Sequence, residues 1–174
     1  MRKNKGYTLI ELGITLTISS LLLGYALPSF YQLKLNKYMD AERNRLSHSL
    51  HFARNYAVNH QIQVIVCSSL SANDCDNKSN WYEGWIVFTD SNRNRKFDGD
   101  DKLLQVEDAM MKDIKATSSL YRQKIRYNSM GFSPATNLSI NFCDERGSEF
   151  AKSIILNNAG RIKQSKPISN NVCE

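Results

Sequence analysis

An apolar run near the amino end constrains this chain more than any other feature of its sequence. Residues 7–27 are numerous enough to cross a bilayer as a helix, which requires roughly 20 mostly apolar residues. Glu11 is the only acidic or basic residue in this run. A charge inside an apolar span is costly and is usually retained for a function. The sequence therefore predicts a membrane-spanning helix in which Glu11 has a partner.

A short basic leader, residues 1–6, precedes the apolar run. A secretory signal would end in a small-residue cleavage site, and no A-x-A pattern follows Leu27. Cleavage after Gly6 would instead release an α-amino group on Tyr7, four residues before Glu11. This amine would be close enough to pair with the carboxylate of Glu11, either within one chain or between neighbouring chains. The basic residues of the leader stay in the cytoplasm, so the remainder of the chain beyond Pro28 is expected on the periplasmic side.

These residues resemble the class III leader and N-terminal helix of type IV pilins and type II secretion pseudopilins. The resemblance rests on Gly6, the aromatic Tyr7, the run TLIEL and Pro28. It implies that a prepilin peptidase cuts after Gly6 and methylates the new N-terminus at Tyr7, where the family normally has Phe. It also implies that the carboxylate of Glu11 pairs with the N-terminus of an adjacent subunit during assembly.

Length and charge fit one anchored domain. A chain of 174 residues accommodates a single globular head on a helical stalk, because domains typically contain about 100 to 150 residues. The net charge of +6 includes Arg2, Lys3 and Lys5, so the side chains retain +3 after removal of the leader. We expect residues 1–6 to be the leader, 7–38 a transmembrane and protruding helix, and 39–174 a periplasmic head.

Four cysteines lie in the expected head, and disulfides persist in the periplasm. Four cysteines allow three pairings, and the sequence alone leaves the choice open. We favour Cys67 with Cys75, which closes a short polar loop, and Cys143 with Cys173, which ties the C-terminus to the sheet. Because the second loop is longer, its disulfide is expected to stabilise the fold more, by about 2 to 4 kcal/mol.

The helical pattern continues beyond Pro28, where proline is expected to bend the helix because it removes one backbone hydrogen bond. Residues at helical spacing predict a stripe facing the core, and basic residues between them predict a solvated face. The helix is expected to run from residue 7 to about residue 59. The stripe comprises Leu46, Leu50, Ala53 and Ala57, and the solvated face comprises Arg43, Arg45, His48 and Arg54.

Short β-rich segments separated by Asn, Asp, Ser and Gly follow the helix and predict antiparallel pairing. In the first, Ile62, Val64 and Val66 alternate with Gln61, Gln63 and Ile65. The predicted fold class is α+β, with the long N-terminal helix packed on an antiparallel sheet or on two small sheets. The expected strands are 62–66, 85–88, 102–106, 124–127, 138–143, 153–156 and 161–164.

The order of these elements narrows the resemblance. The segments 85–105 and 154–165, with the final Cys173, resemble the GspH/FimT/FimU group of minor pilins and pseudopilins. The resemblance covers most of the chain. It implies incorporation into a filament through the N-terminal helix, with other pilins, the prepilin peptidase and the inner membrane as partners.

The segment 90–101 has some features of a calcium loop, and no segment carries a known catalytic motif. Oxygen side chains alternate in 90–101 as in a calcium loop, but Arg95 stands where such a loop has Gly. A polar turn whose side chains bond to their own backbone is the preferred interpretation. We expect no metal, no cofactor and no enzymatic activity, because no phosphate loop, HExxH or paired-carboxylate motif is present. The alternating residues are Asp90, Asn92, Asn94, Asp98 and Asp101.

Basic residues gather in the last segment, where a flexible loop could follow the phosphates of duplex DNA. The residues concerned are Lys152, Arg161, Lys163 and Lys166. Some FimT-type members of the family bind DNA during uptake through a GRxR motif. Residues 160–163, Gly-Arg-Ile-Lys, resemble that motif with Lys in place of the last Arg, which retains the charge but loses the bidentate fork. A small basic patch that only solvates the surface remains the alternative.

The sequence thus predicts a non-enzymatic minor subunit of a type IV pilus, possessing a basic loop that contacts DNA during natural transformation. The expected location is the inner membrane, with one span and a periplasmic head, before assembly and the pilus fibre after it. The alternative is a GspH-like pseudopilin of a type II secretion system, since both classes share leader, helix and head.

Overall fold

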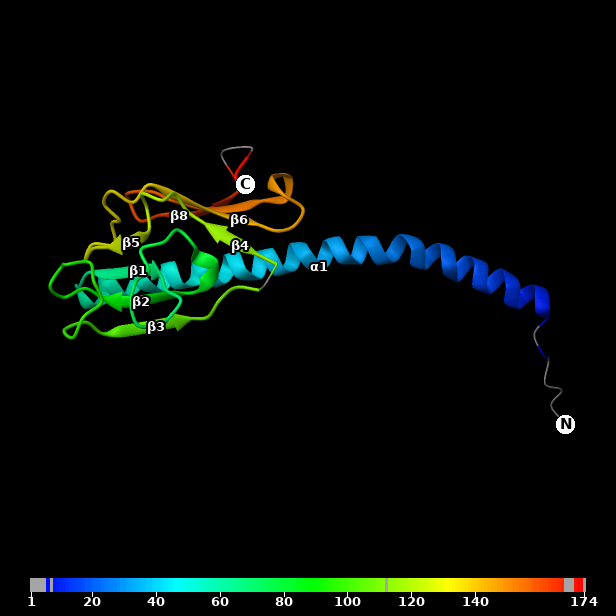
Figure 1. Cartoon of the computed structure of the whole chain (residues 1–174), viewed down its shortest axis with the longest axis horizontal. Coiled ribbons are helices and arrows are strands. Elements are labelled where there is room, and N and C mark those ends of the chain that lie inside the picture. The colour runs from blue at the N-terminus through cyan, green and yellow to red at the C-terminus, as the bar shows by residue number, and fades with distance from the viewer. Residues whose placement is uncertain (1–5, 7, 112, 168–170, 174) are drawn as a thin grey trace. The chain divides into compact units, whose positions relative to one another are not determined.

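The computed structural model describes residues 6, 8–111, 113–167 and 171–173. The chain divides into two compact units, Met1–Lys37 and Tyr38–Glu174. One helix, α1 (Leu9–His60), belongs to both units and agrees within two residues with the expected helix (Figure 1). Pro28 lies inside α1 without interrupting it.

In the first unit, α1 presents apolar side chains in every direction. One 18-residue window has a mean hydropathy of 1.6 and none of it is buried, so by length and composition α1 could span a membrane. The hydroxyls of this stretch donate to carbonyls of the same helix, as Thr17 does to Gly13 at 2.8 Å and Ser19 to Thr15 at 2.7 Å. Such bonds satisfy polar groups where no water is present.

The second unit contains two four-stranded antiparallel sheets, which we call sheet A and sheet B. The α+β class is therefore confirmed, with two sheets. Sheet A has the order β3-β2-β1-β5, formed by Leu103–Glu107, Trp85–Thr89, Val64–Ser68 and Lys124–Tyr127. Sheet B has the order β4-β6-β7-β8, formed by Lys115–Thr117, Leu138–Cys143, Lys152–Leu156 and Ile162–Ser165. Two 3-10 turns, Trp81–Glu83 and Ser148–Phe150, complete the elements.

Seven of these strands correspond to predicted segments, and β4 was missed. β4 has only three residues, Lys115–Thr117, and only Ala116 is buried. Its strand conformation comes from pairing with β6, where Ala116 lies opposite Phe142. A segment this short shows no period of two that the sequence could reveal.

The main core lies between α1 and the two sheets. The predicted stripe on α1 is fully buried, and it packs with the inner residues of both sheets. Trp81, Trp85, Tyr127 and Phe142 are the large aromatic side chains of this core. The stripe residues are Leu46, Leu50, Ala53 and Ala57.

Sheet A also has a small outer core. The predicted alternation in β1 is confirmed, because Val64 and Val66 face the main core and Ile65 faces the other way, but that second face is buried as well. All five residues of β1 and of β2 are buried. Ile65, which was grouped with the polar residues, packs with Ile86 and Phe88 on the face opposite the main core. Phe97 and Cys75 from the neighbouring loops cover this face, and Cys75 is bonded there to Cys67 of β1. A central strand covered on both faces has no polar side, so its side chains alternate between two apolar environments.

The solvated face predicted on α1 was wrong in part. Arg45 lies over the ring of Trp85, with 4.8 Å between the guanidinium carbon and the ring centroid. Its guanidinium donates to the carbonyl of Asp108 at 2.7 Å and pairs with Glu42 and Glu107. Arginine can cover an aromatic core residue with its planar group while satisfying carboxylates around it. Arg45 therefore fastens α1 to the end of β3.

Candidate functional site

The start of α1 is the first candidate site, because it contains Glu11. In the structure this residue also has a local role in capping the helix. The backbone N–H of Glu11 donates to the hydroxyl of Thr8 at 3.3 Å, and the N–H of Thr8 donates to the carboxylate of Glu11 at 3.5 Å. This reciprocal pair is a capping box, which satisfies two backbone donors at a helix N-terminus. The T-x-x-E signal is visible in the sequence at Thr8–Glu11, but we did not recognise it.

Both oxygens of this carboxylate lie at the exposed beginning of the helix. An acid is favoured there because the helix dipole leaves partial positive charge at its N-terminus. Gly6 is exposed, with no atom within 4 Å of the position that a Cβ would occupy. Tyr7 lies outside the described residues, so the predicted pairing of its amine with Glu11 stays a prediction.

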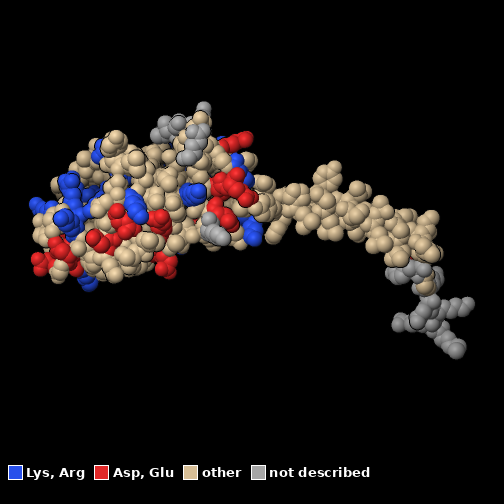
Figure 2. All heavy atoms as spheres, in the orientation of Figure 1, with Lys and Arg blue, Asp and Glu red and all other residues tan. Residues whose placement is uncertain are grey.

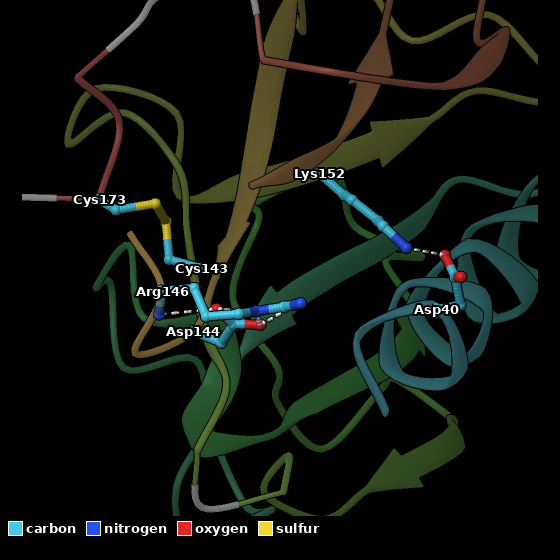
Figure 3. A network of polar contacts seen from close by, with 6 residues as sticks. All are labelled: Asp40, Cys143, Asp144, Arg146, Lys152 and Cys173. Atoms are coloured by element: carbon cyan, nitrogen blue, oxygen red, sulfur yellow. Dashed lines mark hydrogen bonds and ion pairs between the residues drawn. A yellow bond between two sulfur atoms is a disulfide. The ribbon is translucent and has the colours of Figure 1, made fainter. Parts of the chain in front are cut away.

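The two disulfides join the pairs that the sequence favoured. Cys67 is bonded to Cys75 across eight residues, and both side chains lie in the outer core of sheet A. Cys143 is bonded to Cys173 across thirty residues and attaches the C-terminal segment to the end of β6 (Figure 3). The N–H of Cys173 also donates to the hydroxyl of Ser148 at 3.2 Å.

The structure separates Lys152 from the other three basic residues of the predicted DNA-binding group. Lys152 lies on β7 opposite Phe142, and its amine pairs with Asp40 of α1 at 2.8 Å (Figure 3). Arg161, Lys163 and Lys166 are exposed at β8 and its two ends. Among the described residues, none of these three has a carboxylate within 4 Å. The basic group near β8 thus has three members instead of four.

The turn that precedes Arg161 is held against the loop following β5. The N–H of Ser133 donates to the carbonyl of Asn158 at 2.9 Å, and the N–H of Thr136 donates to its side-chain oxygen at 3.1 Å. Gly160 has φ +72°, and a Cβ there would lie 2.2 Å from the carbonyl oxygen of Gly131. Only glycine permits this approach, so the glycine of the Gly-Arg-Ile-Lys motif has a packing role.

A second group of cations was missed from the sequence. Arg95, Arg122, Lys124 and Arg126 line one groove at the β5 edge of sheet A. A sequence signal existed, because 114–143 contains four basic residues and no acidic one. Three of the groove cations lie in that stretch, and the fourth, Arg95, lies in the loop between β2 and β3, so the group forms no run in the sequence.

Hydrogen bonds from its own side chains hold the acidic turn between β2 and β3. The carboxylate of Asp98 accepts hydrogen bonds from the side-chain amides of Asn94 at 2.5 Å and Asn92 at 3.1 Å, and these lower its pKa. The side-chain oxygens of the two asparagines accept backbone N–H groups of the same turn. Among the described residues, no three acidic, His or Cys side chains form a metal-binding group. The geometry agrees with the polar turn that was preferred from the sequence.

Comparison with known proteins identifies two family models in this chain. The model described as type II transport protein GspH matches residues 42–160, and the prokaryotic N-terminal methylation motif matches residues 1–27. No curated protein matches the sequence.

Two solved structures share the fold. Both are crystal structures of the type IV minor pilin FimU of Pseudomonas aeruginosa, strain PAO1. The first is 15% identical with a TM-score of 0.61, and the match covers 75% of this chain and 93% of that one. The second is 16% identical with a TM-score of 0.59, covering 75% of this chain and 98% of that one.

Proposed function

Because the chain belongs to the GspH family of minor pilins and pseudopilins, we propose that it is a non-enzymatic minor subunit of a type IV pilus that enters the filament through α1. Before assembly the subunit is anchored in the inner membrane by α1, with its head in the periplasm. After assembly it is part of the pilus fibre. The observation that carries the proposal is the exposed apolar stretch of α1, in which Glu11 is the one carboxylate between residues 9 and 27 and lies in the matched methylation motif.

Exposed apolar surface of this extent has to be covered by lipid or by protein. In a filament, the same stretch of α1 from other subunits supplies that cover. Cleavage after Gly6 leaves a cationic amine on Tyr7. The carboxylate of Glu11 in a neighbouring subunit is then the one acid within the apolar stretch that can neutralise it. Pairing of these charges selects the register in which one helix joins the next.

Two substitutions separate this pairing from the capping role of Glu11. Gln can replace Glu in a capping box, so Glu11→Gln keeps the helix start but removes the charge. Thr8→Ala removes the cap hydroxyl but keeps the charge. We expect the amount of Glu11→Gln protein in sheared filaments to fall about tenfold, which corresponds to about 1.4 kcal/mol, with its membrane level unchanged. Thr8→Ala is expected to assemble normally.

Immunoblots of sheared fibres and of membranes measure both quantities. Normal incorporation of Glu11→Gln would show that the charge is not needed. Mass spectrometry of the native protein provides a second check. If the chain retains residues 1–6 in cells with an active prepilin peptidase, the proposal that it enters the filament after cleavage at Gly6 is contradicted.

Contact with duplex DNA through the end of β8 is a second candidate function. It is favoured by the exposure of Arg161, Lys163 and Lys166 and by the absence of acidic residues in 150–173. Lysine and arginine release counterions when they neutralise phosphates, so such binding is independent of sequence and weakens with salt. A role in natural transformation would follow from this contact.

The ion pair of Lys152 provides a matched control for this function. We expect Arg161→Ala with Lys163→Ala to weaken duplex binding by the full-length protein and to reduce the slope of log K against log salt by about 1.8. Lys152→Ala is expected to leave binding unchanged, because that amine is held against α1 in an ion pair with Asp40, which also pairs with Arg43. Electrophoretic mobility shifts over a salt series measure both effects. An unchanged mobility shift for the double variant would show that the end of β8 does not contact the duplex.

A GspH-like role in type II secretion is the alternative to a pilus. Deletion of the gene distinguishes the two, since a pilus subunit affects fibres or transformation and a pseudopilin affects export of secreted proteins. Loss of transformation with intact fibres would indicate a DNA receptor. Loss of fibres would indicate a role in assembly.

A further inference from the structure

The groove at the β5 edge of sheet A, which we call the β5 groove, has a lining dominated by cations. It measures about 290 Å³, and four cations line it together with Tyr121. Figure 2 shows several Lys and Arg side chains on the drawn face of the head, near the place of β5 in Figure 1, with Asp and Glu side chains beside them. The four cations are Arg95, Arg122, Lys124 and Arg126.

Strand register directs two of these cations to the outside. Ile125 and Tyr127 of β5 lie in the main core, so Lys124 and Arg126 point to the opposite face. Lys124 lies beside Cys67 and Arg126 beside Ile65, residues that belong to strand β1. The positive charge is therefore placed by the sheet and does not depend on a flexible loop.

Backbone carbonyls hold three of the side chains along the groove. The amine of Lys124 donates to the carbonyl of Arg95 at 2.8 Å, and the guanidinium of Arg126 donates to that of Pro134 at 3.4 Å. The guanidinium of Arg122 donates to the carbonyl of Ala135. A lysine has three donors and an arginine five, so each retains donors for an anion. Fixed side chains lose less conformational freedom when a ligand binds.

Counterions for these cations are scarce. Among the described residues, no carboxylate lies within 4 Å of any of the four side chains. Burial lowers the pKa of Lys124, and the longer-range attraction of Asp74 and Asp90 opposes this shift only in part. The carboxylate of Asp90 is buried and accepts hydrogen bonds from Gln63 and from the N–H of Arg95. The β5 groove thus presents several cations that an anionic ligand could neutralise.

An aromatic ring at the groove indicates which polyanion fits. Tyr121 is 94% exposed although it lines the groove. It also lines the adjoining hollow on the outer face of sheet B, beside Ser139 and Ile155. Proteins that bind single strands combine a basic groove with exposed rings on which bases stack. The bases of a duplex and the headgroups of a lipid offer no such partner.

We propose that the β5 groove binds single-stranded nucleic acid, with phosphates along Arg95, Lys124 and Arg126 and a base stacked on Tyr121. Arg122 supplies a further phosphate contact at the wall shared with the loop after β5. This site differs from the duplex contact proposed at β8. Filament entry through Glu11 does not depend on it.

The test is fluorescence anisotropy with labelled oligothymidylate and the full-length protein in neutral-lipid nanodiscs. Lys124→Gln with Arg126→Gln keeps hydrogen-bond donors but removes two charges. We expect about tenfold weaker binding and a salt slope reduced by about 1.4. Tyr121→Ala is expected to weaken binding about fivefold or more, whereas Tyr121→Phe keeps the ring and binds normally.

Lys102→Gln with Lys115→Gln is the matched control, because it removes two exposed charges from β4 and from the start of β3, on the other edges of the two sheets. It is expected to bind as wild type. The proposal is overturned if the control weakens binding as much as the groove variant, or if Tyr121→Ala has no effect. It is also overturned if the groove variant weakens binding of a duplex of equal length as much as it weakens binding of oligothymidylate, or if anionic phospholipid vesicles displace the oligothymidylate.

Discussion

At the scale of single residues, Tyr127 shows how burial decides the chemistry of a side chain. Its ring lies in the main core, and its hydroxyl has no hydrogen-bond partner among the described residues. Burial strongly raises the pKa of this phenol, and the positive charge of Arg54 opposes that shift only in part. An unpartnered buried hydroxyl costs free energy, since it has lost its hydrogen bonds to water.

Tyr127→Phe is therefore expected to keep or raise the free energy of unfolding at pH 7, by up to about 1 kcal/mol. The unfolded tyrosine ionises near pH 10, while the folded one keeps its proton to higher pH. The folded state then binds more protons, so wild-type stability falls as pH rises above about 10.

Urea unfolding followed by tryptophan fluorescence at pH 7 and above pH 10 measures both effects. The variant should lose less stability between the two pH values than wild type, because the other tyrosines and the lysines are common to both proteins. A large loss of stability at pH 7 would mean that the hydroxyl has a partner.

At the scale of elements, the turn between β7 and β8 decides how Arg161 is presented. The turn packs against the loop after β5 through Ser133, Thr136 and Asn158. Gly160 allows the two backbones to meet, and its φ of +72° is one that other residues adopt only with strain. The same contact joins an edge of sheet A to an edge of sheet B.

Gly160→Ala is expected to destabilise the protein by about 2 kcal/mol or more, since strain and a backbone clash add together. Gly147→Ala is the matched control. Its φ is +82°, but no atom lies within 4 Å of the new Cβ, so it carries the strain alone, at about 1 kcal/mol. Urea denaturation of the two variants measures the difference, and equal losses would show that the turn and the loop move apart easily.

At the scale of the whole molecule, polar contacts and disulfides add to the core in holding the second unit together. Arg45 fastens α1 to β3, and the Cys143–Cys173 disulfide fastens the C-terminal segment to sheet B. Beside that disulfide, Asp144 and Arg146 form a buried ion pair of 2.5 Å in the β6–β7 connection (Figure 3). The Cys67–Cys75 disulfide likewise fastens its loop to the outer core of sheet A.

Replacement of Cys143 and Cys173 by Ala is expected to lower the free energy of unfolding by about 2 to 4 kcal/mol, because the unfolded chain is then no longer constrained over thirty residues. Loop closure alone predicts a smaller loss for Cys67 and Cys75, which close eight residues. Unfolding in urea without reductant measures both. A loss below about 0.5 kcal/mol for the first pair would contradict the entropic account.

Patterns of neighbouring residues were sufficient for much of this fold. The apolar run predicted α1, the stripe at helical spacing predicted the face of α1 that is buried, and seven strands were located. These features are local, because helices and strands repeat their apolar positions roughly every 3.6 or 2 residues along the chain. The family resemblance also followed from local motifs at the N-terminus, and the matched family models confirm it.

The tertiary structure decided the features that depend on residues far apart in the sequence. Ile65 is buried because loops cover the outer face of sheet A, and Arg45 is engaged because Trp85 and Glu107 lie beside it. Lys152 pairs with Asp40, more than a hundred residues away. The β5 groove arises because one strand and two loops bring together cations that the sequence spaces apart. Charge and burial at such positions result from packing, which no local pattern records.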